Sequence, residues 1–125
     1  MKKTLFFTVC VLFSFCAFAQ IESVSVEKFA QELTIAGNEQ LIDIRSSVEF
    51  ERYRIPGSIN ISLRDPKFQE KLEQLDRSKP VLIYCLIGIR TKPMMASLRR
   101  AGFKIVYELD GGIDLWLREG KPIEN

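Results

Sequence analysis

The feature that most constrains this fold is a short apolar run, Val81–Tyr84, which is followed by a cysteine, a glycine-containing loop and a helical pattern. Four apolar or aromatic residues after Pro80 are too few for a helix and are typical of a strand that is buried on both faces. Cys85 stands where this strand would end, and the helical pattern begins near Thr91. The run therefore predicts a buried parallel strand with a cysteine at its carboxyl end and loop amides that lead into a helix N-terminus.

The rest of the chain alternates between strand and helix patterns. Short apolar runs predict further strands at residues 40–45, 58–61 and 104–109. Helical spacing of apolar residues predicts helices at residues 25–36, 46–53, 65–75, 91–101 and 113–117. We therefore expect an α/β domain with a mostly parallel central sheet of about five strands, flanked by helices on both faces.

Capping signals bound several of these helices. Ser25 is expected to cap the first helix and Gly37 to end it, and Ser46–Glu49 fits a capping box. Asp65–Pro66 predicts another N-cap followed by proline in the first turn. The tail Lys121–Asn125 is expected to fray, so the last packed element would be the helix before it.

The N-terminus has the organisation of a secretory signal peptide. Two lysines precede an apolar run at residues 5–18, which ends in the small-residue site Ala17–Ala19. We predict cleavage near Ala19, so that residues 1–19 are the signal peptide and residues 20–125 form a single domain in a periplasmic or extracellular space. The run is short for a membrane span, so no stable membrane anchor is expected after cleavage.

Cysteine use and charge restrict the function further. Cys10 and Cys16 lie within the predicted signal, and Phe15 before Cys16 argues against a lipid-modified cysteine there. Cys85 would then be the sole cysteine of the exported chain and could form no intramolecular disulfide. The signal holds two of the 18 basic residues and none of the 16 acidic ones, so the exported domain is formally neutral. This balance gives no indication of nucleic acid or an anionic membrane as a partner.

Four separated motifs occur in an order that is found in a known family. They are Leu41–Arg45 with Glu49–Phe50, Ile55–Ile61, Cys85–Arg90, and Leu109–Gly112 with Trp116. Over about residues 25–121 the chain resembles the single-domain rhodaneses, which are sulfurtransferases. The resemblance implies a sheet sandwiched by helices, and a cysteine that takes up sulfane sulfur as a persulfide and passes it to a thiophilic acceptor. We expect no cofactor, and a chain without histidine offers no metal site built from cysteine and histidine.

Cys85 and Arg90 are the candidate catalytic residues, and we call the segment Cys85–Arg90 the cysteine loop. The thiolate of Cys85 would be the nucleophile, and loop amides, a helix N-terminus and Arg90 all favour that ionised form. A glycine within the loop would let successive N–H groups converge on one point, where an anion or a persulfide sulfur would be held. The residues between the cysteine and the arginine form the expected substrate-binding group: Leu86, Ile87, Gly88 and Ile89.

The expected reaction consists of two displacements at sulfur. Cys85 attacks a small-molecule sulfur donor, thiosulfate or a persulfide, and the acceptor then attacks the persulfide on Cys85. The acceptor would be a thiol, a cyanide-like nucleophile or an acceptor protein. Because Leu86, Ile87 and Ile89 are apolar, thiosulfate is expected to be a poorer donor than a larger or less charged persulfide.

Residues at the ends of the neighbouring strands are expected to support the site. Asp43 and Arg45 would brace a strand end through Glu49 or through loop amides. Gly111 and Gly112 would form a tight turn and let the backbone pass close to the cysteine loop. Solvated charges, unless they recruit an acidic donor protein, are expected at three further positions: Lys92, Arg99 and Arg100.

The loop length and the absence of histidine argue against related chemistries. Cysteine phosphatases place five residues between their cysteine and arginine, whereas four stand between Cys85 and Arg90. A chain without histidine has neither the histidine that precedes the phosphatase cysteine nor a Cys-His protease dyad. The chain also departs from the rhodanese pattern, because Arg54 precedes Ile55–Gly57 where the family usually has histidine.

Two other functions stay open at this point. A cysteine after a buried strand is also typical of an inert core residue, so a rhodanese-fold binding module without turnover is one alternative. A redox sensor that forms mixed disulfides or sulfenic acid at Cys85 is the other.

Overall fold

The computed structural model describes residues 1–12, 18–36 and 40–125. In this part of the chain, five parallel strands form one sheet in the order β1-β5-β4-β2-β3. The strands are β1 (Gln20–Val24), β2 (Leu41–Asp43), β3 (Ile59–Asn60), β4 (Val81–Tyr84) and β5 (Ile105–Leu109). The helices are α1 (Val26–Ala36), α2 (Ser47–Arg52), α3 (Phe68–Glu73), α4 (Lys92–Arg100) and α5 (Gly112–Arg118). The predicted α/β architecture with a parallel sheet is confirmed.

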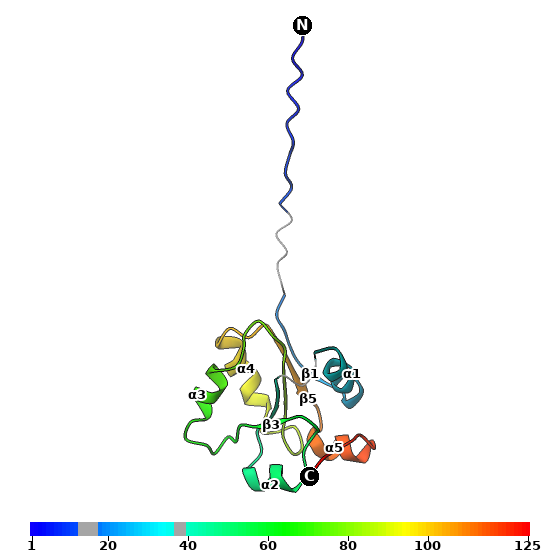
Figure 1. The fold of residues 1–125 in the computed structure, drawn as a ribbon, viewed down its shortest axis with the longest axis vertical. Helices are drawn as coiled ribbons and strands as arrows, with labels where there is room; N and C mark the ends of the chain where they lie inside the picture. Colours follow the sequence, from blue (N-terminus) through cyan, green and yellow to red (C-terminus); the bar gives the residue numbers. More distant parts are fainter. Residues whose placement is uncertain (13–17, 37–39) are drawn as a thin grey trace.

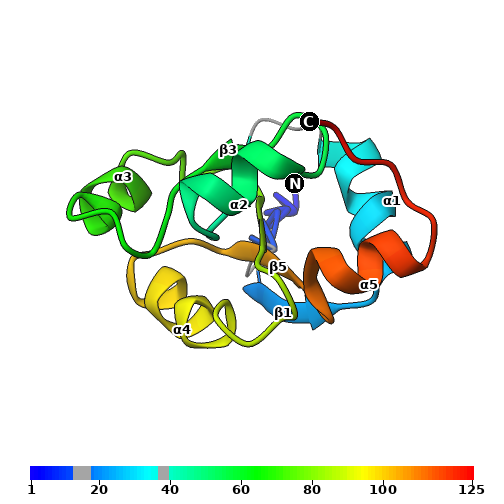
Figure 2. The ribbon, with the colours of Figure 1, turned by 90° about the horizontal axis from the view of Figure 1, so that it is seen from below.

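Helices cover both faces of the sheet, with α3 and α4 on one side and α1 and α5 on the other (Figure 2). Successive side chains of a strand point to opposite faces, and β4 supplies both cores in this way. Leu82 packs in the cluster that contains Phe29 of α1. Ile83 and Cys85 pack in the cluster that contains Leu98 of α4. The apolar run is therefore buried because two layers of helices cover it, as its composition predicted.

The sequence did not predict β1, which forms one edge of the sheet. Its pairing with β5 is continuous from Gln20 opposite Ile105 to Val24 opposite Leu109. Val24 is its buried residue, and the others are exposed or half-buried. An edge strand is held by backbone pairing on one side and needs little apolar surface, so β1 lacks the pattern that marks the inner strands.

The predicted caps are partly correct. In the capping box of α2, Ser46 Oγ accepts from the backbone N–H of Glu49 (3.2 Å), and the Glu49 carboxylate accepts from the backbone N–H of Ser46 (2.9 Å). The N-cap predicted at Asp65 is wrong, because α3 starts beyond it and the Asp65 carboxylate instead accepts from the N–H of Lys67 (2.8 Å) in the preceding turn. The predicted helix end at Gly37 lies outside the described residues.

The prediction that the C-terminal tail frays is wrong. The backbones of Arg54 and Glu124 exchange two hydrogen bonds of 2.9 Å, and the Arg54 guanidinium pairs with the Glu124 carboxylate at 3.2 Å. The indole Nε1 of Trp116 donates to the carbonyl of Pro122 (2.8 Å). The tail is thus docked beside the chain segment where Arg54 replaces the histidine usual in the resembled family.

At the other end of the chain, residues 1–12 form no helix or strand and extend away from the domain (Figure 1). None of the helices in the described ranges has the length and apolar character needed to cross a membrane. The predicted signal peptide and its cleavage near Ala19 stay predictions.

Candidate active site

Cys85 directly follows β4, a strand in the middle of the sheet. Ligands of parallel α/β sheets gather at the carboxyl ends of the strands, which is where this residue lies. Its side chain has no exposed surface. Its sulfur nevertheless faces polar groups, because the N–H of Gly88 donates to Sγ (3.2 Å) and Oγ1 of Thr91 lies 3.6 Å from Sγ. Cys85 is therefore as buried as a core cysteine, but its sulfur contacts polar groups, as expected for a nucleophile.

Gly88 turns the cysteine loop back toward the sulfur. Its φ is +83°, a backbone conformation that L side chains rarely adopt. A Cβ at this position would also lie 3.0 Å from the backbone nitrogen of Gly111. The neighbours of Gly88 point outward, since the side chains of Ile87 and Ile89 are 51% and 66% exposed, whereas Leu86 is half-buried.

The start of α5 holds the other side of the loop. The N–H groups of Ile113 and Asp114 donate to the carbonyls of Cys85 (2.9 Å) and Leu86 (3.0 Å). Gly112 makes this approach possible, because a Cβ there would lie 2.4 Å from the carbonyl oxygen of Leu86. The backbone of the glycine turn therefore does pass close to the cysteine loop and forms one of its walls.

Arg90 pairs with Glu49 at the N-terminus of α2. Its two terminal nitrogens donate to the two carboxylate oxygens of Glu49 at 2.9 and 3.2 Å. Because Glu49 also accepts from Ser46, the acid of the capping box fixes the guanidinium beside the loop. The hydrogen bond from Arg90 is the main cause that lowers the pKa of Glu49 to about 2. The positive charge of Arg90, which the sequence predicted would favour the Cys85 thiolate, is thus shared with a carboxylate.

We expect this pair to stabilise the fold in a pH-dependent way. The folded pKa of Glu49, about 2, lies below its ordinary value of 4.5, so its contribution is complete above about pH 5 and is lost as the pH falls toward the folded pKa. Since both side chains are partly exposed, Glu49→Gln should cost about 1 kcal/mol of unfolding free energy at pH 7. Urea unfolding at pH 7 and pH 3 measures this cost, which should shrink at pH 3.

The matched control is Glu51→Gln, because Glu51 is an exposed residue of the same helix. It should leave the unfolding free energy nearly unchanged at both pH values. A cost of Glu49→Gln that is equal at pH 7 and pH 3 would contradict the assigned role of the carboxylate.

Asp43 and Arg45 form a buried ion pair at the end of β2. Nη2 of Arg45 donates to Oδ2 of Asp43 (2.7 Å), Nε contacts both carboxylate oxygens (3.1 Å), and Nη2 also donates to the carbonyl of Tyr53 (2.6 Å). Of the two predicted braces, the loop amide is present, because the N–H of Arg45 donates to Oδ1 of Asp43 (2.9 Å). Glu49, the other brace that the sequence offered, pairs with Arg90 instead.

Removing one partner of the buried pair should be costly. Asp43 and Arg45 are fully enclosed, and breaking such a pair leaves an uncompensated charge that costs about 3–5 kcal/mol. We expect Asp43→Asn to lower the unfolding free energy by about 3 kcal/mol, measured by chemical denaturation. Asp110→Asn, at the exposed residue after β5, is the control and should change it by less than about 0.5 kcal/mol. Equal effects of the two variants would refute the structural role of the pair.

The structure adds three residues that the sequence did not assign to the site. Thr91 and Glu108 are fully buried, and Oγ1 of Thr91 donates to Oε1 of Glu108 (2.7 Å). Nζ of Lys92 donates to Oε2 of Glu108 (2.8 Å), so Lys92 is an exposed charge, as predicted, that also pairs with a buried carboxylate. A signal for this network was present in the sequence, because a carboxylate inside the apolar run 105–109 needs a buried partner.

A cavity of about 200 Å³ lies beside the cysteine loop, between the loop and α2. Its walls combine an apolar side chain of the loop with an aromatic ring and charged groups. The lining residues are Arg45, Glu49, Arg52, Tyr53 and Leu86. Because Leu86 of the cysteine loop lines this cavity, it is the candidate site for the donor.

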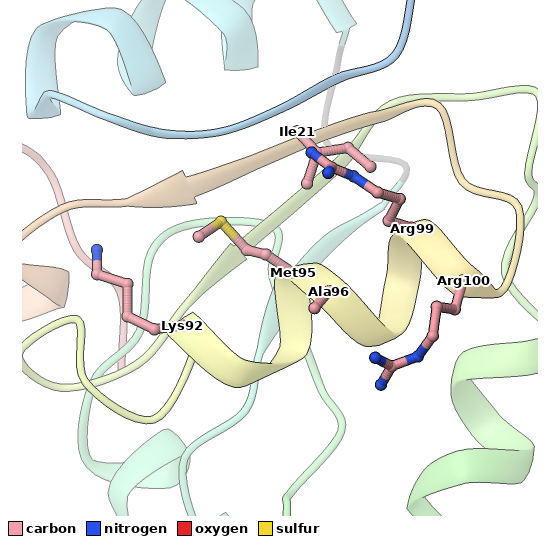
Figure 3. A pocket seen from close by; sticks show the side chains of 6 residues that line it. All are labelled: Ile21, Lys92, Met95, Ala96, Arg99 and Arg100. Carbon is pink, nitrogen blue, oxygen red and sulfur yellow. The ribbon is translucent and has the colours of Figure 1, made fainter.

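A larger groove, of about 390 Å³, runs along α4 and the edge strand β1 (Figure 3). In Figure 3, Lys92 lies at one end of the helix, and Arg99 at the other end lies beside Ile21. The groove is lined by Ile21, Lys92, Met95, Ala96, Arg99 and Arg100. It contains no residue of the cysteine loop and shares no lining residue with the cavity beside that loop, but Lys92, the partner of Glu108, lies at one end of it.

The fold and the site together define a class of protein. It is an α/β domain whose central parallel strand ends in a cysteine, with a short loop that returns an amide to the sulfur and an arginine at its end. The chain matches the rhodanese-like domain family over residues 25–119 and belongs to that family. The resemblance seen in the sequence is thereby confirmed.

Individual relatives agree with this membership. The thiosulfate sulfurtransferase GlpE of Coxiella burnetii is 37% identical over 76 residues, which cover 61% of this chain and 69% of that protein. A rhodanese-related protein of Thermoplasma volcanium has a solved structure with 27% identity and a TM-score of 0.71, over 82% of this chain and 97% of that one. Reduced CoADR-RHD of Bacillus anthracis has 29% identity and a TM-score of 0.65, over 77% of this chain and 16% of that one. Sulfurtransferase activity is thus supported at the level of the family.

Proposed function

We propose that this protein is a sulfurtransferase that carries sulfane sulfur on Cys85. The observation that supports this most directly is the hydrogen bond from the Gly88 N–H to the Cys85 sulfur at the carboxyl edge of the sheet (3.2 Å). An N–H donor stabilises a thiolate or a persulfide anion more than a neutral thiol. Membership of the rhodanese-like family and a relative named as a thiosulfate sulfurtransferase point to the same chemistry.

The proposed reaction has two balanced steps. The Cys85 thiolate attacks the sulfane sulfur of the donor, a bond forms between the two sulfurs, and the donor leaves as sulfite from thiosulfate or as a thiolate from a persulfide. The acceptor then attacks the outer sulfur of the Cys85 persulfide. The bond to Cys85 breaks, its electron pair stays on Sγ, and Cys85 returns to the thiolate.

The proposed donor is a persulfide rather than thiosulfate. Leu86 lines the cavity beside the loop together with the ring of Tyr53, and these surfaces suit the apolar part of an organic persulfide. Arg90 is paired with Glu49, so it offers a dianion such as thiosulfate less attraction than an unpaired arginine would. Because Cys85 has no exposed surface, the proposed reaction requires that the Leu86 side of the loop moves aside to admit the donor.

Intact-mass spectrometry tests the proposal. The protein is incubated with thiosulfate, with glutathione persulfide or with buffer alone. We expect a gain of one sulfur atom with either donor, more quickly with the persulfide, and peptide mapping should find the added sulfur on Cys85. No gain with either donor would overturn the proposal, and equal rates with the two donors would overturn the donor preference.

A rhodanese-fold binding module is the second candidate, and the complete burial of Cys85 favours it. The exposed side chains of Ile87 and Ile89 would then contact a partner protein. This candidate requires that Cys85→Ala retains partner binding while the unmodified protein takes up no sulfur.

Export to a periplasmic or extracellular space is part of the proposal. Its support is the order of lysines, apolar run and small residues before Gln20. The start of β1 at Gln20 agrees with it, because cleavage near Ala19 would leave the whole sheet intact. N-terminal sequencing of the exported protein tests the cleavage site.

A further inference from the structure

A chain of polar contacts leads from the candidate nucleophile to a carboxylate inside the sheet. Oγ1 of Thr91 lies 3.6 Å from Sγ of Cys85 and donates to Oε1 of Glu108 (2.7 Å). The other oxygen of Glu108 accepts from Nζ of Lys92 (2.8 Å) and from the hydroxyl of Ser23. Cys85, Thr91 and Glu108 have no exposed surface, so water does not compete for the two contacts that Thr91 makes with Cys85 and Glu108.

The hydroxyl of Thr91 has one hydrogen, which can serve one acceptor at a time. While that hydrogen is donated to Glu108, Thr91 can only accept from Cys85, which suits the neutral thiol. An anionic sulfur needs a donor, so the same hydrogen would then have to turn from Glu108 to Sγ. The carboxylate and the sulfur anion therefore compete for one hydrogen, and the charge of Glu108 also opposes a second negative charge nearby.

Glu108 can release the hydrogen because its other partners stay in place. Partial burial lowers the pKa of Lys92, but the hydrogen bond and charge of Glu108 and the charge of Asp110 outweigh it, so the pKa is raised and Lys92 stays charged. Two further ion pairs lie beside the loop. They are Arg90 with Glu49 and Arg45 with Asp43.

We infer that Glu108 is a positioning residue that acts on Cys85 through the hydroxyl of Thr91. Glu108 holds the Thr91 hydrogen while Cys85 is a thiol and yields it to Sγ when the sulfur becomes an anion. In the second step of the proposed reaction, the acceptor attacks the outer sulfur and the electron pair of the broken bond stays on Sγ. The Thr91 hydrogen then stabilises Cys85 as the leaving thiolate.

The inference rests on the proposed function for this last step, but its test does not need sulfur transfer. The thiolate of Cys85 is titrated by its ultraviolet absorbance in a chain with Cys10→Ser and Cys16→Ser, with the further variant Cys85→Ser as the baseline. Below the titration midpoint, Glu108→Gln should raise the thiolate fraction about tenfold, because the negative charge is removed and the acceptor that competes for the Thr91 hydrogen is weakened. Thr91→Val should lower the fraction several-fold, and Thr91→Ser should restore it.

The double variant Thr91→Val, Glu108→Gln decides whether Glu108 acts through Thr91. We expect Glu108→Gln to change the thiolate fraction clearly less when Thr91 is already valine. An equal effect in both backgrounds, or no effect of Glu108→Gln alone, would overturn the inference. If Glu108→Gln does not fold, the comparison of Thr91→Val with Thr91→Ser still tests the inference. An unchanged titration of Cys85 in Thr91→Val would show that the Thr91 hydroxyl does not act on the sulfur, and would overturn the inference. The predicted titrations without any sulfur uptake would leave the inference standing and refute the proposed function.

Discussion

Cys85→Ser is expected to abolish sulfur loading and transfer, with a loss of at least about a thousandfold in rate. A serine hydroxyl is far less nucleophilic than a thiolate and cannot hold sulfur as a persulfide. The variant should still fold, because serine fits the space of cysteine and the Gly88 N–H and Thr91 hydroxyl can bond to its oxygen. Intact mass after incubation with glutathione persulfide, together with transfer of sulfur to a thiol acceptor, measures the loss.

The matched control is Cys10→Ser, since Cys10 is an exposed cysteine within the predicted signal. This variant should load one sulfur at the rate of the unmodified protein. Sulfur loading that persists in Cys85→Ser and disappears in Cys10→Ser would show that Cys10, and not Cys85, carries the sulfur.

Gly112→Ala is expected to slow sulfur loading at least tenfold and to lower the unfolding free energy by about 2 kcal/mol. The φ of Gly112 is +63°, and the new Cβ would lie 2.4 Å from the carbonyl oxygen of Leu86 and 2.6 Å from that of Cys85. Those two carbonyls accept the N–H groups of α5 that hold the loop. The clash would push the cysteine loop away from α5 and misplace the sulfur.

Gly120→Ala separates backbone strain from this clash. Gly120 also has a positive φ, +74°, but a Cβ there meets no atom within 4 Å. It should therefore show a smaller loss of stability and no loss of loading rate. Denaturation and loading rates of the two variants provide the comparison, and equal losses in both would show that contact with the loop does not matter.

Local patterns predicted most of the fold. The inner strands β2, β4 and β5 carry apolar runs, and their helices carry apolar residues at helical spacing, so both were found from composition and periodicity. The capping box at Ser46 was found because its two partners stand three residues apart. The edge strand β1 and the docked tail were missed, because both are held by partners far away in the sequence.

The sequence predicted the residues of the cysteine loop but not the residues from other elements that contact them. The positions of Cys85, Gly88 and Arg90 follow from one continuous segment, so their spacing was visible. The partner of Arg90 could not be read from the sequence, because Glu49 lies in α2, far from Arg90 along the chain. The carboxylate of Glu108 was overlooked for the same reason, since its contacts come from α4 and β1.

By itself the sequence determined the alternation of strands and helices, the cysteine after a buried strand and the glycine that turns the following loop, because each depends on neighbouring residues. The tertiary structure decided which charged groups meet. The order β1-β5-β4-β2-β3 places β5 between β1 and β4, so Glu108 reaches both Ser23 and the residues that follow β4. Contacts of this kind depend on which strands are neighbours in the sheet, and distance along the chain does not specify that choice.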